Sequence, residues 1–261
     1  MTDTAAFFSP SPGAPRLAYL ARAGNVPPGL FWLGGFRSDM RGSKAQFLDS
    51  LAEAQSRPCL RFDYSGHGKS DGAFADGTIG KWAAQALAVF RALTRGPQIV
   101  VGSSMGGWIA LLLARALADA GESARLAGMV LIAPAVDFTE ELIWPRLPEE
   151  ARRAIVAEGR WTRPADAYGE AYPLTRALFE DGKVNSLFGR EIRTHCPVAI
   201  LQGMEDPDVP WRHAMRLMES LASDPATIAL IKDGDHRLSR PQDLAALARA
   251  IETLEGQPRG G

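Results

Sequence analysis

A G-x-S-x-G pattern at residues 102–106 constrains this chain most, because a buried strand leads into it and a helix follows it. The apolar, β-branched residues 99–101 are typical of a strand that is buried on both faces of a parallel sheet. Segment 105–119 combines strong helix formers with a dense apolar pattern, which predicts a buried central helix. A serine at such a strand-to-helix turn has the setting of a catalytic nucleophile, so Ser104 is the candidate.

Two glycine-containing turns predict the donors for a negatively charged reaction intermediate. Gly102 and Gly106 allow the strained, crowded backbone that a nucleophile turn needs. The amide of Met105 begins the helix, where unpaired N–H groups and the helix dipole favour a developing oxyanion. A glycine pair at residues 34–35 follows the apolar run 30–33, and we expect the Phe36 amide to be the second donor.

Serine needs a base within hydrogen-bond reach, and His236 is the candidate. It follows the last predicted strand, 226–231, in a short glycine-containing loop that can carry a side chain above the sheet. His195 precedes a strand and His213 lies at a helix start, so we expect surface or packing positions for both. His67 lies between two glycines in a tight loop, where we expect structural support.

A carboxylate must hold the base in one tautomer, and Asp206 is the first choice because it lies in the loop immediately after the predicted strand 197–202. The order along the chain is then Ser104, Asp206, His236. Three other carboxylates lie after strand ends and stay alternatives for the acid: Glu205, Asp208 and Asp137.

The alternation of strands and helices predicts an α/β fold with a mostly parallel, twisted, doubly wound sheet and helices on both faces. Its 261 residues suit a single domain, 1–261. Further helices are expected at 43–57, 78–94, 211–221 and 239–254, with Ser43 as a cap and an S-x-x-Q capping box at 239–242.

Residues 137–196 are too long for a simple connection and predict a lid insertion over the carboxyl ends of the strands. Short helices are expected at 148–158 and 174–180. The insertion is rich in aromatic residues, most of which we expect to attach the lid to the body. Those that we expect to contact substrate are Trp161, Tyr168 and Tyr172.

Composition limits the classes of partner that we expect for this chain. Lys and Arg number 29 against 30 Asp and Glu, so no basic field would attract nucleic acid. Cys59 and Cys196 make neither a disulfide framework nor a metal-ligand cluster, and we expect neither a metal nor an organic cofactor. No apolar run is long enough to cross a bilayer, and segment 1–15 lacks the pattern of a secretory or transit peptide. We therefore expect a cytoplasmic protein without membrane insertion; the oligomeric state stays open.

From about residue 30 to 254 the chain resembles the α/β-hydrolase superfamily, whose members have their nucleophile, acid and histidine in the order seen here. A narrower resemblance is to the mitochondrial palmitoyl-protein thioesterases that also hydrolyse mycophenolic acid acyl-glucuronide. The segments that carry this narrower resemblance are 61–68, 102–108, 203–204, 209–211 and 235–237, with the pair Trp161 and Tyr168.

The resemblance implies hydrolysis of thioesters or activated carboxylic esters through an acyl-enzyme, with Ser104, Asp206 and His236 at the positions of the family's triad. It implies a small-molecule ester or thioester, or an acylated protein, as substrate. Segment 1–15 departs from the mitochondrial pattern, which favours a bacterial cytoplasmic relative.

Two other classes of function stay open. A fold of this kind can serve as a catalytically silent binding module, and the same triad can serve a peptidase or a carbon–carbon bond hydrolase. A dehalogenase or an epoxide hydrolase would use a carboxylate at the turn, and Ser104 excludes both.

Overall fold

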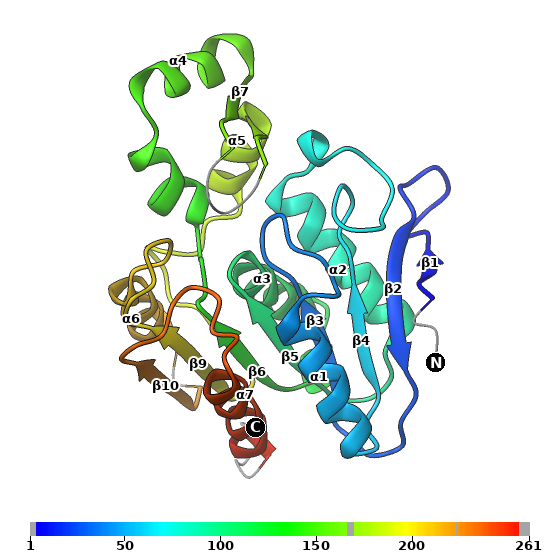
Figure 1. Cartoon of the computed structure of the whole chain (residues 1–261). Coiled ribbons are helices and arrows are strands. Elements are labelled where there is room, and N and C mark those ends of the chain that lie inside the picture. Colours follow the sequence, from blue (N-terminus) through cyan, green and yellow to red (C-terminus); the bar gives the residue numbers. More distant parts are fainter. Residues whose placement is uncertain (1–3, 166–169, 223, 256–261) are drawn as a thin grey trace.

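The computed structural model describes residues 4–165, 170–222 and 224–255. Eight strands form one sheet in the order β1-β2-β4-β3-β5-β6-β9-β10, and two more form a small antiparallel hairpin, β7-β8 (Figure 1). The strands of the large sheet are β1 (Ala6–Phe8), β2 (Leu17–Arg22), β3 (Gly29–Leu33), β4 (Cys59–Phe62), β5 (Gln98–Ser103), β6 (Leu126–Ile132), β9 (Val198–Gly203) and β10 (Ala226–Ile231).

The sheet is mostly parallel, as predicted. β1 and β4 pair antiparallel with β2, and every pair from β4 to β10 is parallel. The register sets Leu33 opposite Gly102 and Ile132 opposite Leu201. The carboxyl ends of β3, β5, β6, β9 and β10 therefore meet at one edge, and the loops that carry the candidate residues leave from that edge.

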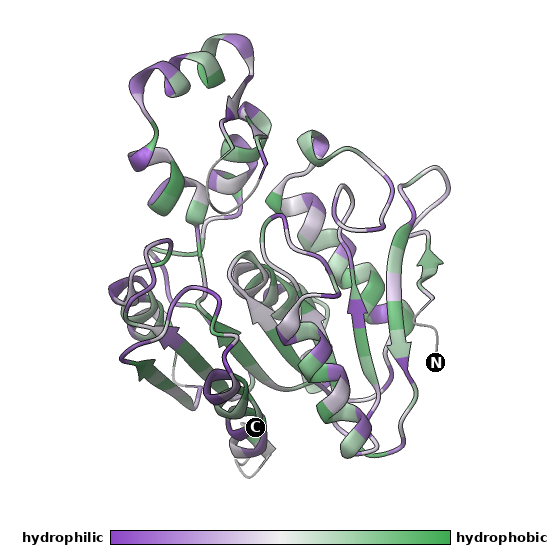
Figure 2. Cartoon of the chain, in the orientation of Figure 1, coloured by the Kyte–Doolittle hydropathy of each residue, from purple (hydrophilic) through white to green (hydrophobic). Residues whose placement is uncertain are grey.

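Helices cover both faces of the sheet, again as predicted (Figure 1). One face carries α1 (Ser43–Ala54) and α7 (Pro241–Glu255); the other carries α2 (Ile79–Leu93), α3 (Met105–Asp119) and α6 (Trp211–Ser220). Burying both faces explains why β3, β5, β6 and β9 are hydrophobic along nearly their whole length (Figure 2). Two short 3₁₀ turns, η1 (Phe74–Asp76) and η2 (Ser123–Arg125), complete the body.

Helix α3 has the bounds that the sequence predicts, and Thr78 caps α2 by accepting a hydrogen bond from the Lys81 amide. Two predicted caps are wrong. Gly42 precedes α1 and no side chain caps that helix. At α7 the Asp243 carboxylate accepts the Arg240 amide, while the Ser239 hydroxyl donates to the Arg237 carbonyl. A charged acceptor inside the first turn serves there instead of the serine.

The segment that the sequence predicts to be a lid projects from the carboxyl ends of the strands, at the top of Figure 1, and we use the name lid for it below. Its elements are a π-helical turn η3 (Thr139–Ile143), a 3₁₀ turn η4 (Trp144–Arg146), α4 (Glu149–Glu158), the hairpin β7 (Arg160–Arg163) and β8 (Tyr172–Thr175), and α5 (Arg176–Val184). The helix predicted at 174–180 begins at Arg176 instead, because Thr175 caps it and residues 172–175 pair with β7.

The lid leaves the body and returns to it at one point. The Asp137 carboxylate accepts hydrogen bonds from the Ser186 hydroxyl at 2.6 Å and from the amides of Leu187 at 2.9 Å and Phe188 at 2.8 Å. These hydrogen bonds fix the two ends of the insertion to each other. They also occupy the carboxylate of Asp137, which was one of the alternatives for the catalytic acid.

Cys59 and Cys196 are buried and unpaired, and burial raises the pKa of each thiol to about 12. Both thiols therefore stay protonated and pack as small apolar side chains. Within the described ranges, no helix combines the length and the apolar character needed to cross a bilayer.

Candidate active site

Ser104 stands at the sharp turn between β5 and α3 with a strained backbone, φ 55° and ψ −118°. The turn is tight enough that a Cβ on Gly102 would lie 2.3 Å from the Gly106 carbonyl oxygen, and one on Gly106 would lie 2.1 Å from that of Leu33. Glycine is required at both positions because no side chain fits there. Steric crowding therefore explains the two glycines of the G-x-S-x-G pattern, as the sequence predicts.

Main-chain hydrogen bonds hold the Ser104 backbone in this conformation. Its amide donates to the Ile132 carbonyl at 2.8 Å, and its carbonyl accepts the amides of Gly107 at 2.9 Å and Ala135 at 3.1 Å. β6 and the loop after it thus stabilise the turn. Several simultaneous hydrogen bonds of this kind are needed to keep a non-glycine residue at positive φ.

Asp206 and His236 form a hydrogen-bonded pair, although they follow different strands. The Nδ1 atom of His236 lies 2.8 Å from the Asp206 Oδ2 atom. The Asp206 side chain is fully buried, and that of His236 is 26% exposed. A buried carboxylate at Nδ1 fixes the imidazole orientation and leaves Nε2 for the role of base that the sequence predicts.

The Asp206 carboxylate is itself held by its own loop. Its Oδ1 accepts the amides of Asp208 and Val209, each at 2.9 Å, and its Oδ2 accepts the Gln202 side-chain amide at 3.2 Å. The carboxylates of Asp208 and Glu205 lie on exposed residues instead. Sequence reasoning missed Gln202, because a buried polar residue inside a strand reveals its partner only once the following loop folds back.

Ser104, His236 and Phe36 line one cavity of about 200 Å³ at the carboxyl edge of the sheet. The loop after β3 approaches the nucleophile closely, since a Cβ on Gly35 would lie 3.3 Å from the Ser104 Cβ. The structure thus brings together the predicted nucleophile, the predicted base and the loop with the predicted Phe36 donor. Asp206 lies behind His236 and does not line the cavity.

The loop after β3 is held on both sides of Phe36. The Gly35 amide donates to the Ser38 hydroxyl oxygen at 2.9 Å, and the Arg37 amide donates to His67 Nε2 at 3.2 Å. His67 is buried and supports this loop, in agreement with the structural position expected for it.

Lys44 also lines the cavity, and sequence reasoning missed it. Its ammonium group donates to the Arg237 carbonyl, next to the candidate base, and burial lowers its pKa to about 8. A lysine in the first turn of a surface helix carries no sequence signal of this contact.

The three predicted lid aromatics have different positions. Tyr172 reaches the site through Phe36, with ring centroids 5.8 Å apart, and the Arg37 guanidinium lies 4.2 Å from the Tyr172 centroid. Trp161 lies opposite Leu174 in the hairpin and does not line the cavity. Tyr168 lies outside the described residues.

The remaining histidines serve packing or the surface, as expected. His213 is buried, its Nε2 lies 2.9 Å from the Val136 carbonyl, and burial lowers its pKa. His195 is exposed.

Metal-type ligands gather at one place in the described part of the chain, where ligand atoms of Asp206, Asp208 and His236 lie within 4.8 Å of one another. The pairing of His236 Nδ1 with Asp206 already uses the ring nitrogen that a metal would need, so we assign no metal to this group.

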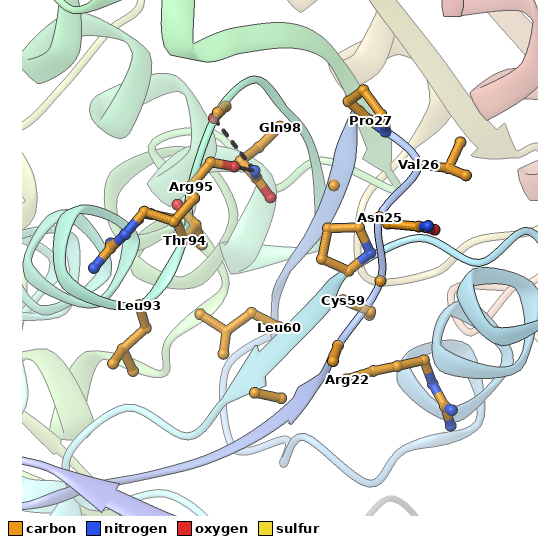
Figure 3. Close-up of a pocket in the computed structure, with 16 residues that line it drawn as sticks. Arg22, Asn25, Val26, Pro27, Cys59, Leu60, Leu93, Thr94, Arg95 and Gln98 are labelled. Carbon is orange, nitrogen blue, oxygen red and sulfur yellow. Dashed lines mark hydrogen bonds between the residues drawn. The ribbon is translucent and has the colours of Figure 1, made fainter.

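A larger hollow, of about 550 Å³, lies at the other end of the sheet (Figure 3). Its walls include Gly29 and Gln98, which begin β3 and β5, whereas Ser104 follows the end of β5. The Gln98 side-chain amide donates to the carbonyls of Arg95, Gly96 and Pro97. This hollow contains none of the candidate catalytic residues.

Comparisons with known proteins identify the family of the chain. The model of the alpha/beta hydrolase family matches residues 8–247. The chain is 32% identical to the human palmitoyl-protein thioesterase ABHD10, mitochondrial, over 252 residues that make up 96% of this chain and 80% of the relative. The narrower resemblance to these thioesterases is therefore confirmed.

Solved structures give the same result. A crystal structure of an Agrobacterium vitis S4 protein has a TM-score of 0.89 at 46% identity, covering 96% of this chain and 97% of that one. The mouse alpha/beta hydrolase domain-containing protein 10 has a TM-score of 0.85 at 31% identity, covering 96% and 98%. With its sheet order, its strained serine turn and these matches, the chain belongs to the alpha/beta hydrolase family.

Proposed function

We propose that the chain is a serine hydrolase that cleaves carboxylic esters or thioesters through an acyl-enzyme. The observation that carries the proposal is the 2.8 Å contact between His236 Nδ1 and the buried Asp206 carboxylate, with His236 and Ser104 lining one cavity. A serine at positive φ ahead of a helix, with a carboxylate-bound histidine beside it, suits nucleophilic acyl transfer.

In the first half-reaction His236 Nε2 takes the Ser104 hydroxyl proton while Oγ attacks the acyl carbonyl carbon. The Phe36 and Met105 amides donate to the oxyanion of the tetrahedral intermediate. His236 then gives the proton to the departing alcohol or thiol, and Asp206 stabilises the imidazolium between these two transfers. Water, deprotonated by the same histidine, attacks the acyl carbonyl carbon of the acyl-enzyme. His236 returns that proton to Ser104 Oγ as the bond from Oγ to the acyl carbon breaks, which releases the carboxylic acid and restores the free enzyme.

Two observations support thioesters and acylated molecules among the substrates. The human and mouse relatives are named as palmitoyl-protein thioesterases, and the chain covers about four-fifths of their length. Phe36, which lines the cavity, stacks edge-on against lid residue Tyr172 and body residue Phe74, so aromatic surface borders the nucleophile. Such surface suits an apolar acyl group.

The test compares kcat/KM on p-nitrophenyl esters of increasing chain length, acyl thioesters and acyl-glucuronides, using wild type and Ser104→Ala. We expect turnover on at least one of these classes and its loss in the variant. Retained turnover in Ser104→Ala on every substrate would refute the nucleophile. Failure of a folded wild type to react with a fluorophosphonate, read by intact mass, would favour a silent binding module.

The compartment stays a prediction. The relatives named above are called mitochondrial, whereas we propose the cytoplasm for this chain. Cell fractionation with a compartment marker on each side distinguishes the two.

A further inference from the structure

We propose that His67 is a positioning residue for the oxyanion hole, acting through the hydrogen bond from the Arg37 amide to its Nε2 atom. The inference rests on the proposed function, because it assigns His67 a task in the same reaction. His67 lies 37 residues before Ser104 in the chain, makes its hydrogen bonds to Arg37 and Ser65 and not to the Asp206–His236 pair, and has no place in the proton transfers of the mechanism.

The hydrogen bond to His67 is made by a residue with a strained backbone. Arg37 has a positive φ of 61°, which a non-glycine residue keeps only when its surroundings enforce it. The bond of its amide to His67 measures 3.2 Å, and the neighbouring Gly35 amide is bound to Ser38 at 2.9 Å. Phe36 lies between these two fixed amides. The Gly35 carbonyl, in the same peptide as the Phe36 N–H, accepts the Ser38 amide at 3.1 Å, so the direction of that N–H depends on all three contacts.

The second observation is that His67 is fixed on its other side. Its Nδ1 lies 3.2 Å from the Ser65 carbonyl, which also accepts the Trp82 indole N–H at 3.2 Å. Gln85 of α2 holds Ser65 in turn, accepting its amide at 3.0 Å and donating to its hydroxyl at 2.8 Å. A continuous set of hydrogen bonds therefore runs from α2 to the loop after β3.

The third observation is the state of the ring. Because an amide N–H donates to Nε2, that nitrogen must be unprotonated, and the proton lies on Nδ1, facing Ser65. Tyr64, Phe74 and Trp82 surround the ring edge-on, and burial lowers the pKa of His67 to about 4. A neutral imidazole with a permanent acceptor at Nε2 is the form that this contact needs near pH 7.

A second contact braces the same loop further along. The Asp63 carboxylate accepts the Met40 amide at 2.7 Å with Oδ1 and the Lys69 amide at 2.9 Å with Oδ2. Residues 63–70 thus hold the loop after β3 at two amides, and the one nearer the nucleophile is held by His67. A donor that is fixed before reaction needs no reorganisation when the oxyanion forms.

The kinetic test compares His67→Met, which keeps a similar volume without the acceptor, with His67→Gln, whose carbonyl oxygen can replace Nε2. Removing a whole oxyanion donor costs about 100-fold or more in kcat, so we expect loss of its alignment to cost about 10-fold. KM should stay within about twofold, since ground-state binding is untouched. The Gln variant should recover most of kcat. His195→Met, at the exposed histidine, is the matched control and should equal wild type.

A folded His67→Met with wild-type kcat, or an equal loss in Met and Gln variants of equal melting temperature, would overturn the proposal. A measurement on wild type decides the case in which His67→Met does not fold. Long-range ¹⁵N–¹H correlation spectra at pH 7 should identify an Nδ1–H tautomer for His67. A proton on Nε2 would overturn the proposal without any variant.

The outcomes separate this inference from the proposed function. If wild type neither turns over esters nor reacts with a fluorophosphonate, the proposed hydrolase is wrong, whatever tautomer His67 has. If Ser104→Ala abolishes turnover while His67→Met leaves kcat unchanged, the hydrolase stands and only the role of His67 is wrong.

Discussion

The carboxylate of Asp206 accepts from an imidazole, a side-chain amide and two main-chain amides, and its side chain is fully buried. Asp206→Asn keeps its size but offers an N–H or a neutral oxygen to His236, so the wrong tautomer is favoured. We expect kcat to fall about 10⁴-fold, by analogy with the serine protease triad. Steady-state kinetics on a p-nitrophenyl ester measure the loss.

Asp208→Asn is the control for that change, because Asp208 contributes its amide and its side chain is exposed. Its exposed carboxylate lies within 4.8 Å of the Asp206–His236 pair, but solvent screens it, so kcat should stay within about tenfold of wild type. Equal losses in the two variants would mean that Asp206 is not the acid.

His67 also predicts how stability depends on pH. Burial lowers its pKa from 6.5 to about 4, so the folded state stays neutral where the unfolded state binds a proton. The stability that this group contributes is complete above pH 6.5 and is lost as pH falls through about 4. The loss amounts to about 3 kcal/mol over that window.

Denaturant unfolding at several pH values checks this prediction. Between pH 7 and pH 4, wild type should lose more unfolding free energy than His67→Gln, whose side chain does not titrate. Parallel curves for the two proteins would contradict it.

The turn between β5 and α3 makes a prediction at the level of the element. A Cβ on Gly106 would lie 2.1 Å from the Leu33 carbonyl oxygen, so Gly106→Ala must push α3 away from β3. We expect this to destabilise the fold by about 2–3 kcal/mol, the range of overpacked cores. The same shift moves the Met105 amide, so surviving protein should also have reduced kcat.

Gly42→Ala is the matched variant, since its added Cβ would lie 3.7 Å from its nearest neighbour, the Asp39 carbonyl oxygen. Gly42 precedes α1 with φ −61°, which any residue adopts, so the change should cost less than about 1 kcal/mol. Thermal melts of both variants measure the difference. A Gly106→Ala protein as stable as Gly42→Ala would refute the steric account of the pattern.

Elements differ in how far the sequence predicts them. The bounds of α3 and the mostly parallel sheet follow from long apolar patterns that tertiary structure reinforces. The hairpin of β7 and β8 was not predicted, because its strands have four residues each and Pro173 interrupts one of them. The π-helical turn at Thr139–Ile143 was missed for a similar reason, since one irregular turn has no period of its own.

The residues of the site also differ in how far the sequence predicts them. The order of Ser104, Asp206 and His236 follows from strand ends, which the sequence makes visible. The contacts of Gln202 with Asp206, of Lys44 with Arg237 and of His67 with Arg37 join segments whose approach only the folded loops determine. Position in the chain predicts which residues reach the edge of the sheet; packing decides which of them touch.

The chain as a whole should unfold as one unit, and we propose residues 1–261 as a single domain with the lid at about 137–196. Lid residues Ile155, Leu178 and Phe179 belong to the same buried cluster as Trp108 and Leu111 of the body. Losing the lid would therefore expose the body's own core.

Hydrogen exchange read by mass spectrometry in increasing denaturant measures this coupling. Peptides from α4 and α5 should become unprotected at the same denaturant concentration as peptides from β5 and β6. If the lid peptides exchanged at a lower concentration while the sheet stayed protected, the lid would be a separate cooperative unit.

The three hydrogen bonds of Asp137 have a consequence for how this molecule can vary. They join residues 49 to 51 positions apart. The chain therefore returns to the body at the point where it left, and these contacts do not depend on the residues in between. Because closing a longer loop adds only about 0.6 kcal/mol per doubling of its length, lids of other sizes could be exchanged there at little cost to the body. Asp137 would then act as a fixed junction, at which a different choice of substrate is grafted onto an unchanged catalytic body.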